Sequence, residues 1–259
     1  MTRTTNRVEF LGHASFTLAG IVEVPSRSPR GGILFSHCFT CNKDLKAIVR
    51  ISRELADLGW SVLRYDFMGL GGSQGQFQKS SFTTNRQDLA GAFRFLKTTC
   101  DHPIFLMGHS FGGAASLSMA QELDVQGVIA LAAPSDTRHL AELLQRMDPR
   151  IWEQGIGSVS IGGRSYTVER QMIEDFLAFD LAKLVQALSK PLLAIHSTAD
   201  ETVDFRHAYV NCRFGQVPFA ANRSLFSLSG SNHLLTNQPG DCKRIAILVD
   251  TWCRGLLDP

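Results

Sequence analysis

The sequence predicts an α/β fold, in which helices cover both faces of a mostly parallel sheet. Short apolar runs alternate along the chain with segments whose apolar residues recur every three or four positions, and this is the pattern of strands alternating with helices. The length of 259 residues suits one α/β domain, since such domains commonly reach about 250 residues. A hydrophobic content of 44% is normal for a globular core and excludes a disordered or fibrous chain. We therefore expect one domain that spans residues 1–259.

The predicted strands are short apolar runs bounded by glycine or polar residues. The first two form a hairpin, because only a short polar stretch that contains Gly12 and His13 separates them. The later runs are nearly continuous in apolar residues, as expected of strands that are buried on both faces. In chain order the predicted strands cover residues 8–11, 16–24, 33–35, 60–65, 104–107, 128–132, 192–195 and 225–228.

The predicted helices lie between these strands and after the last one. Residues 45–58 carry an apolar residue at every third or fourth position, and Gly59 can end that helix. Residues 89–96 repeat the pattern. Residues 112–122 are mostly small, and residues 245–256 form a closing helix with an apolar stripe.

Residues 134–190 interrupt the alternation, because they are too many for a plain connection between two core strands. Within them, residues 159–168 alternate around Gly162 and Gly163, as two strands joined by a tight turn do. Insertions at the carboxyl end of an open sheet lie where ligands bind. We therefore expect a small lid over the site, with an interaction flap that takes no part in substrate binding as the alternative.

The balance of charge excludes nucleic acid as a partner. The chain has 26 basic and 24 acidic residues, a net charge of +2, which leaves no excess for a phosphate backbone. It shows neither an apolar signal core near its start nor the roughly 18 to 20 apolar residues that a membrane span needs. Six cysteines are too few for a disulfide scaffold. We expect a cytoplasmic protein with reduced thiols and no membrane partner.

The clearest chemical signal is the segment Gly108-His109-Ser110-Phe111-Gly112-Gly113, which follows one predicted strand and precedes a helix. A nucleophilic serine needs a sharp turn from strand to helix that lifts its hydroxyl out of the sheet. Glycines two positions before and after the serine permit that turn. We therefore predict that Ser110 is a nucleophile.

A serine hydroxyl becomes a good nucleophile only when a base takes its proton and an acid orients that base. Asp200 and His233 each lie just beyond the carboxyl end of a predicted strand, in the order that this turn requires. We predict that His233 is the base and Asp200 the acid. Asp136 and Asp204 remain alternatives for the acid.

Three other histidines, His37, His109 and His196, each end a predicted strand, and we expect them to be structural. The oxyanion of an acyl-transfer reaction needs two backbone N–H donors. We expect these donors at Phe111, directly after the nucleophile, and at Phe39, in the loop after residues 33–35.

The Cys-x-x-Cys pair formed by Cys38 and Cys41 flanks Phe39, and no metal-ligand set accompanies it. We expect both cysteines to be packing residues. The alternative is a disulfide across Phe39 and Thr40, which would rotate the Phe39 N–H and slow the reaction.

Over nearly its whole length the chain resembles α/β-hydrolases. The resemblance rests on the segment around Ser110, the late His233, the His-x-x-x-Asp sequence that ends at Asp200, and the run Tyr65-Asp66-Phe67-Met68-Gly69-Leu70-Gly71-Gly72-Ser73. More narrowly, His37-Cys38-Phe39-Thr40-Cys41-Asn42-Lys43-Asp44-Leu45-Lys46 resembles the hydrolase half of bacterial hydrolase–OsmC fusion proteins. Cys38 replaces a glycine of many members, and Asp204 replaces a proline. We expect no OsmC peroxidase module after the closing helix.

These residues and the resemblance imply a serine hydrolase that cleaves carboxylic esters of small to medium acyl groups through an acyl-enzyme on Ser110. We expect a small-molecule ester as its partner and neither a metal nor an organic cofactor. A thioesterase, a peptidase, an acyltransferase or a cofactor-free perhydrolase would use the same three residues. A hydrolase-fold binding protein without catalysis is the alternative from another class.

Overall fold

The fold is taken from a computed structural model, in which residues 3–213, 222–238 and 240–258 are described. In that part of the chain the main sheet has eight strands in the order β1-β2-β4-β3-β5-β6-β9-β10. β1 and β2 form an antiparallel hairpin, β2 pairs antiparallel with β4, and the remaining pairs are parallel. The strands are β1 (Thr4–Leu11), β2 (Thr17–Val24), β3 (Gly31–Ser36), β4 (Trp60–Tyr65), β5 (Ile104–His109), β6 (Gly127–Leu131), β9 (Leu192–Ser197) and β10 (Arg223–Leu228). The predicted mostly parallel sheet is confirmed.

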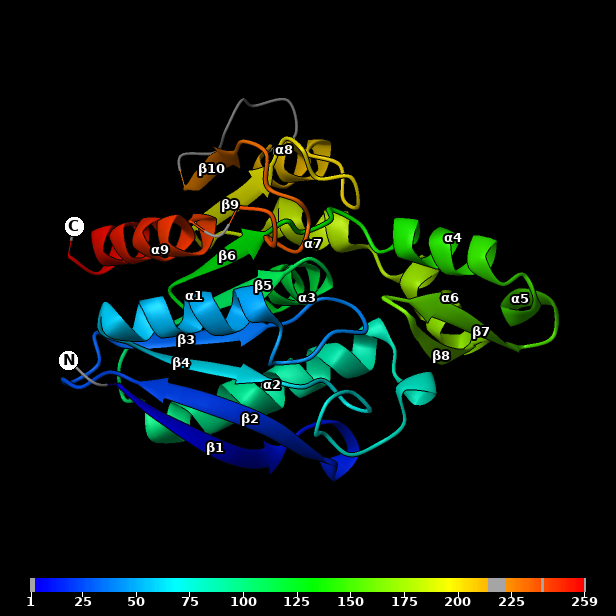
Figure 1. The fold of residues 1–259 in the computed structure, drawn as a ribbon, viewed down its shortest axis with the longest axis horizontal. Helices are drawn as coiled ribbons and strands as arrows, with labels where there is room; N and C mark the ends of the chain where they lie inside the picture. Colours follow the sequence, from blue (N-terminus) through cyan, green and yellow to red (C-terminus); the bar gives the residue numbers. More distant parts are fainter. Residues whose placement is uncertain (1–2, 214–221, 239, 259) are drawn as a thin grey trace.

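Helices cover both faces of this sheet (Figure 1). α1 (Lys46–Asp57) and α9 (Asp241–Leu257) pack side by side on one face, and α2 (Phe82–Thr99) and α3 (Phe111–Met119) lie on the other. Successive side chains of β3 point to opposite faces of the sheet and so belong to the two separate halves of the core. Ile33 and Phe35 pack with α1, whereas Leu34 packs with α2. α8 (Arg206–Cys212) packs against β9 and β10.

Several element boundaries differ from the predicted ones: β1 begins at Thr4 instead of residue 8, α9 begins at Asp241 instead of residue 245, and α3 ends at Met119 instead of residue 122. The largest difference is at the start of α2. Apolar periodicity places that helix at residues 89–96, but it begins at Phe82. The earlier start comes from a capping box, in which the Ser81 hydroxyl accepts from the Thr84 amide and the Thr84 hydroxyl accepts from the Ser81 amide. This pairing satisfies two amides that the helix leaves unbonded.

Most elements of the segment between β6 and β9 lie beyond the carboxyl ends of the parallel strands, whereas its last helix packs against α3 (Figure 1). The predicted hairpin is present, and its turn contains Gly162 and Gly163 with φ of 58° and 77°. Val159 and Val168 of the hairpin belong to the same buried cluster as α2 and α3. The elements of the segment between β6 and β9 are α4 (Arg138–Met147), α5 (Arg150–Glu153), β7 (Ile156–Ile161), β8 (Arg164–Glu169), α6 (Arg170–Ala178) and α7 (Leu181–Ala187).

A buried ionic link fixes the loop that follows β3. Arg64 of β4 is 2% exposed, donates to the Glu23 carboxylate of β2 at 2.7 Å, and donates from Nε to the Lys43 carbonyl at 3.0 Å. Lys43 in turn donates from its amide and its ammonium to the buried Asp66 carboxylate. The loop that carries Phe39 therefore joins the sheet through charge-assisted hydrogen bonds, which are the stronger kind.

Within the described residues, no helix combines the length and the apolar character needed to cross a membrane.

Candidate active site

Ser110 lies in a strained turn between β5 and α3. Its backbone has φ of 55° and ψ of −121°, a conformation that residues other than glycine rarely adopt. The neighbouring glycines are required for space. A Cβ at Gly112 would lie 2.4 Å from the carbonyl oxygens of Ser36 and His37, and a Cβ at Gly108 would lie 2.1 Å from the Gly112 oxygen. The turn predicted from the glycine spacing is therefore present, with Ser110 at its apex.

The structure brings the three predicted side chains into one hydrogen-bonded chain. His233 follows β10 and places Nε2 2.9 Å from the Ser110 hydroxyl oxygen. Its Nδ1 lies 2.8 Å from the Asp200 carboxylate. The other oxygen of that carboxylate accepts from the amides of Thr202 and Val203, each at 2.9 Å. This arrangement fixes the orientation of Asp200 before any substrate binds.

The environment of Asp200 keeps the carboxylate ionised. Burial alone would raise the pKa of the Asp200 carboxyl, but hydrogen bonds from His196 and His233 hold this pKa well below its ordinary value. An ionised Asp200 accepts a hydrogen bond from the Nδ1–H group of His233. Nε2 of His233 then faces Ser110 as an acceptor, which is the tautomer that general-base chemistry requires.

The two alternative acids have other partners. Asp136 accepts from the His139 amide at 3.0 Å, and hydrogen bonds from His139 lower the pKa of Asp136 to about 2. Asp204 accepts from the Arg206 amide at 2.8 Å, where α8 begins. Within the described residues neither carboxylate contacts His233, so the geometry favours Asp200.

The two backbone amides expected as oxyanion donors belong to Phe39 and Phe111, which line the same pocket as Ser110. Phe111 is the first residue of α3, and Phe39 lies in the turn after β3, as predicted. In the part of the chain that the structure describes, neither amide has a hydrogen-bond partner. The Cys41 amide donates to the Cys38 carbonyl at 3.2 Å and closes the turn around Phe39. His37 braces it, because Nδ1 donates to the Cys38 carbonyl at 2.7 Å.

The expectation of reduced thiols is wrong for Cys38 and Cys41. These residues form a disulfide across the turn, with their Cα atoms 5.4 Å apart. The turn brings the two cysteines within the roughly 7 Å that a disulfide tolerates. The other four cysteines are buried and free.

Two of the histidines expected to be structural contact the site directly. His109 donates from Nε2 to the His233 carbonyl at 2.8 Å. His109, which directly precedes Ser110, therefore holds the loop that carries His233. His196 places Nε2 2.8 Å from the Val203 carbonyl and 3.4 Å from the Asp200 carboxylate. Their places at strand ends indicate this proximity, but periodicity does not reveal their partners.

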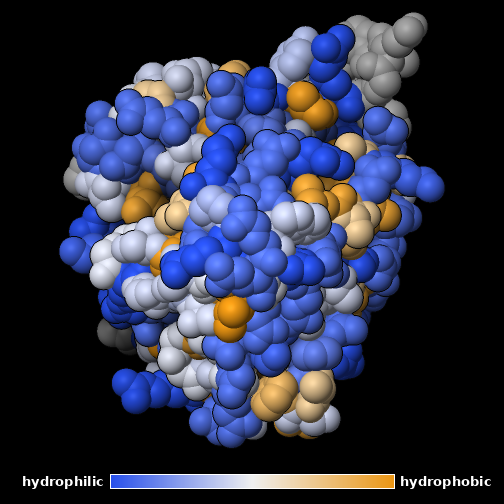
Figure 2. Space-filling model, turned by 90° about the vertical axis from the view of Figure 1, so that its right-hand side faces the viewer, coloured by the Kyte–Doolittle hydropathy of each residue, from blue (hydrophilic) through white to orange (hydrophobic). Residues whose placement is uncertain are grey.

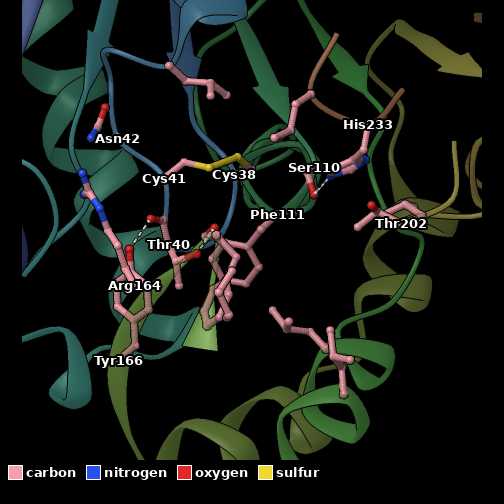
Figure 3. A pocket seen from close by; sticks show the side chains of 18 of the residues that line it. Cys38, Thr40, Cys41, Asn42, Ser110, Phe111, Arg164, Tyr166, Thr202 and His233 are labelled. Atoms are coloured by element: carbon pink, nitrogen blue, oxygen red, sulfur yellow. Dashed lines mark hydrogen bonds between the residues drawn. A yellow bond between two sulfur atoms is a disulfide. The ribbon is translucent and has the colours of Figure 1, made fainter. Parts of the chain in front are cut away.

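A cleft of about 820 Å³ opens in front of Ser110 (Figure 3). One part of its lining is apolar and comes largely from the segment between β6 and β9, including Leu140, Leu143, Met147 and Ile161. The hairpin also contributes Tyr166, which the sequence analysis did not single out. The Tyr166 hydroxyl donates to the Thr40 carbonyl at 2.9 Å, so this segment is joined to the turn that carries Phe39.

Comparisons with known proteins agree with the α/β-hydrolase fold. Residues 27–175 match the family described as serine aminopeptidase, S33. The esterase domain of a Rhodothermus marinus protein is 31% identical, with 97% of this chain and 98% of that domain covered and a TM-score of 0.74. Est1E of Butyrivibrio proteoclasticus with bound ferulic acid is 18% identical, with 96% and 99% covered and a TM-score of 0.80, which supports the fold alone.

Among curated relatives, Protein ABHD12B of Homo sapiens is 27% identical over 164 residues, which make up 61% of this chain and 42% of that protein. The chain thus spans less than half the length of this relative.

His109 makes the stability of the protein depend on pH. Burial, with a smaller effect of the neighbouring His233, lowers the pKa of His109 to about 3. In the unfolded chain this histidine binds a proton below about pH 6.5, so it destabilises the fold increasingly as the pH falls from about 6.5 towards 3.

His109→Gln keeps an N–H donor and removes the titration. We expect the loss of unfolding free energy between about pH 7 and about pH 5 to shrink by about 2 kcal/mol in this variant. Urea titrations at both pH values measure it, and an unchanged loss contradicts a neutral buried imidazole.

Proposed function

The chain belongs to the serine aminopeptidase S33 family of α/β-hydrolases, and we propose that it hydrolyses carboxylic esters with a small to medium acyl group. The observation that carries the proposal is the continuous chain from Ser110 through His233 to Asp200, beside two unpartnered amides. The full-length likeness to an esterase domain supports the choice of an ester.

In the proposed reaction, the Ser110 oxygen attacks the ester carbonyl carbon while His233 Nε2 takes the hydroxyl proton. The carbonyl oxygen becomes an oxyanion, and the amides of Phe39 and Phe111 donate to it; one such donor is worth about 3 to 4 kcal/mol of barrier. The bond to the alcohol oxygen then breaks, His233 protonates the departing alcohol, and the acyl group remains on Ser110. Water activated by His233 releases the acid by the same steps.

The charges of the cleft favour an ester over an aminopeptidase substrate. An aminopeptidase binds a free ammonium group, for which a carboxylate partner is the natural ligand. Asp44 is the acidic side chain in the lining, and it already faces the Lys43 ammonium at 3.3 Å. The cationic side chains Lys46 and Arg164 line the same cleft and would repel an ammonium.

We further propose that residues 134–190 act as a lid that covers a small-molecule substrate. We do not expect this segment to bind a lipid surface. Figure 2 looks onto the face that carries this segment, where hydrophobic residues form separate patches in a mostly hydrophilic surface. Membrane-binding surfaces instead present a contiguous apolar patch. We also propose a cytoplasmic location. The kinship of residues 37–46 with the hydrolase half of hydrolase–OsmC fusions is proposed on that decapeptide alone.

A panel of 4-nitrophenyl esters of rising acyl length, run beside an acyl thioester and an aminoacyl 4-nitroanilide, tests the proposal. We expect the short and medium esters to be hydrolysed fastest and a fluorophosphonate probe to label Ser110 once, because only a base-activated serine attacks phosphorus readily. Ser110→Ala should abolish both turnover and labelling while circular dichroism stays unchanged. Faster cleavage of the anilide, or labelling at another serine, would refute the assignment.

The choice of acid is tested by Asp200→Asn. Because the amide cannot hold the imidazole in the required tautomer, we expect kcat to fall about ten-thousandfold. Asp136→Asn is the matched control, since that carboxylate contacts His139 rather than His233, and it should change kcat little. Steady-state kinetics measure kcat for both variants. A larger loss of kcat in Asp136→Asn than in Asp200→Asn would assign the acid to Asp136, after β6.

The contact between Tyr166 and Thr40 positions the turn of Phe39, whose amide acts on the transition state. We expect Tyr166→Phe to lower kcat by about threefold to tenfold, because it removes one hydrogen bond worth about 0.5–1.5 kcal/mol, with little change in KM. Initial-rate kinetics on 4-nitrophenyl butyrate separate the two constants. A raised KM with unchanged kcat would show that Tyr166 only contacts the substrate.

A further inference from the structure

The face that β8 turns toward the cleft determines where Arg164 points. Side chains two residues apart share one face of a strand, so Arg164, Tyr166 and Val168 point the same way. Val168 is fully buried, and the Tyr166 hydroxyl reaches the Thr40 carbonyl. Arg164 completes this row at the end next to the Gly162–Gly163 turn. It is exposed, and both Arg164 and Asn42 line the cleft (Figure 3).

Positive charge exceeds negative charge in the lining of this cleft. In the part of the chain that the structure describes, neither Arg164 nor Lys46 has an ion pair or a hydrogen bond. Asp44, which lines the same cleft, pairs with Lys43. By contrast, Lys79 pairs with Glu169 of the same hairpin at 2.8 Å. Among the described residues that line this cleft, the cations Arg164 and Lys46 thus outnumber the one carboxylate, that of Asp44.

Asn42 adds a neutral donor at the same end of the cleft (Figure 3). Its side-chain oxygen accepts from the Asp44 amide at 2.9 Å. With the oxygen engaged, the Nδ2 hydrogens are the part of the amide left to bind a ligand. A guanidinium and an amide N–H group together suit an oxyanion with two acceptor oxygens.

We propose that this end of the cleft binds a carboxylate at the far end of the acyl group, so that the substrates are half-esters of dicarboxylic acids. This inference rests on the proposed ester hydrolysis and names its substrate class. The departing alcohol takes its proton from His233 and therefore lies on the side of His233. Figure 3 shows Ser110 between His233 on one side and Thr40 and Arg164 on the other, so the acyl group extends toward Arg164.

Arginine suits this task better than a point charge, because its planar fork can donate two parallel hydrogen bonds to one carboxylate. The site is open to solvent, so the gain is moderate and depends on salt. We expect a preference of about tenfold in kcat/KM for the acid-bearing ester, expressed mainly in KM.

The experiment compares mono-4-nitrophenyl esters of adipic, suberic and sebacic acid with the same compounds methylated at the far carboxylate. The readout is the ratio of kcat/KM for the acid over its methyl ester, which cancels changes in the catalytic step. We expect this ratio to exceed one for at least one chain length, to fall about tenfold in Arg164→Gln, and to fall in wild type at high ionic strength. Lys46→Gln should lower it less, since an ammonium lacks the fork geometry.

Arg146→Gln is the matched control, because Arg146 is an exposed cation of the neighbouring α4 that lies outside the cleft lining. Its ratio should equal that of the wild type. If the methyl esters are hydrolysed but the ratio is one or below at every length, or does not change in Arg164→Gln, the carboxylate site is refuted and the ester hydrolase stands. If no ester is hydrolysed, both proposals fail.

Discussion

The candidate site depends on how closely α3 approaches the sheet. Gly112 lies so near the carbonyls of Ser36 and His37 that no larger residue fits, and this contact sets the distance between the nucleophile and the turn after β3. The backbone strain at Ser110 has a cost of about 1–3 kcal/mol, which the surroundings must offset. They do so with hydrogen bonds on both sides. The Ser110 amide donates to the Leu131 carbonyl at 2.8 Å, and the Gly113 amide donates to the Ser110 carbonyl at 2.8 Å.

Burial keeps two imidazoles next to the site in their neutral form. His37 and His109 are fully buried, and burial lowers the pKa of both rings. Each uses a ring N–H to hold a main-chain carbonyl, His37 in the turn of Phe39 and His109 in the loop of His233. Neutral imidazoles add no charge that would oppose a cationic His233. In the proposed reaction, the ionised Asp200 stabilises the His233 cation that forms when Ser110 attacks the ester.

Besides its apolar lining residues, the segment between β6 and β9 contributes two polar residues of one strand face to the site. Tyr166 attaches the hairpin of β7 and β8 to the turn that carries Phe39. Arg164 lies on the same face of β8 and lines the cleft. A small change in the position of the hairpin would therefore alter both the proposed oxyanion donor and the proposed substrate contact. This coupling gives the segment a structural reason to bear on catalysis and on specificity together.

The sequence by itself determined the kinds and order of the main-sheet elements and the residues with the right chemistry. Periods of 2 and 3.6 residues are readable in short windows, and the glycines around Ser110 predict its turn without knowledge of distant contacts. Asp200 and His233 could be placed near Ser110 because the carboxyl ends of parallel strands meet at one edge of a sheet.

Only the tertiary structure decided which strand-end residues touch. It separated Asp200 from Asp136, gave His109 and His196 their partners, closed the bond between Cys38 and Cys41, and brought Tyr166 to Thr40. Tyr166 and Thr40 are 126 positions apart, and His233 and Ser110 are 123 apart. Contacts at such separation depend on the order of strands in the sheet and on the path of the inserted segment, and local periodicity carries no information on either.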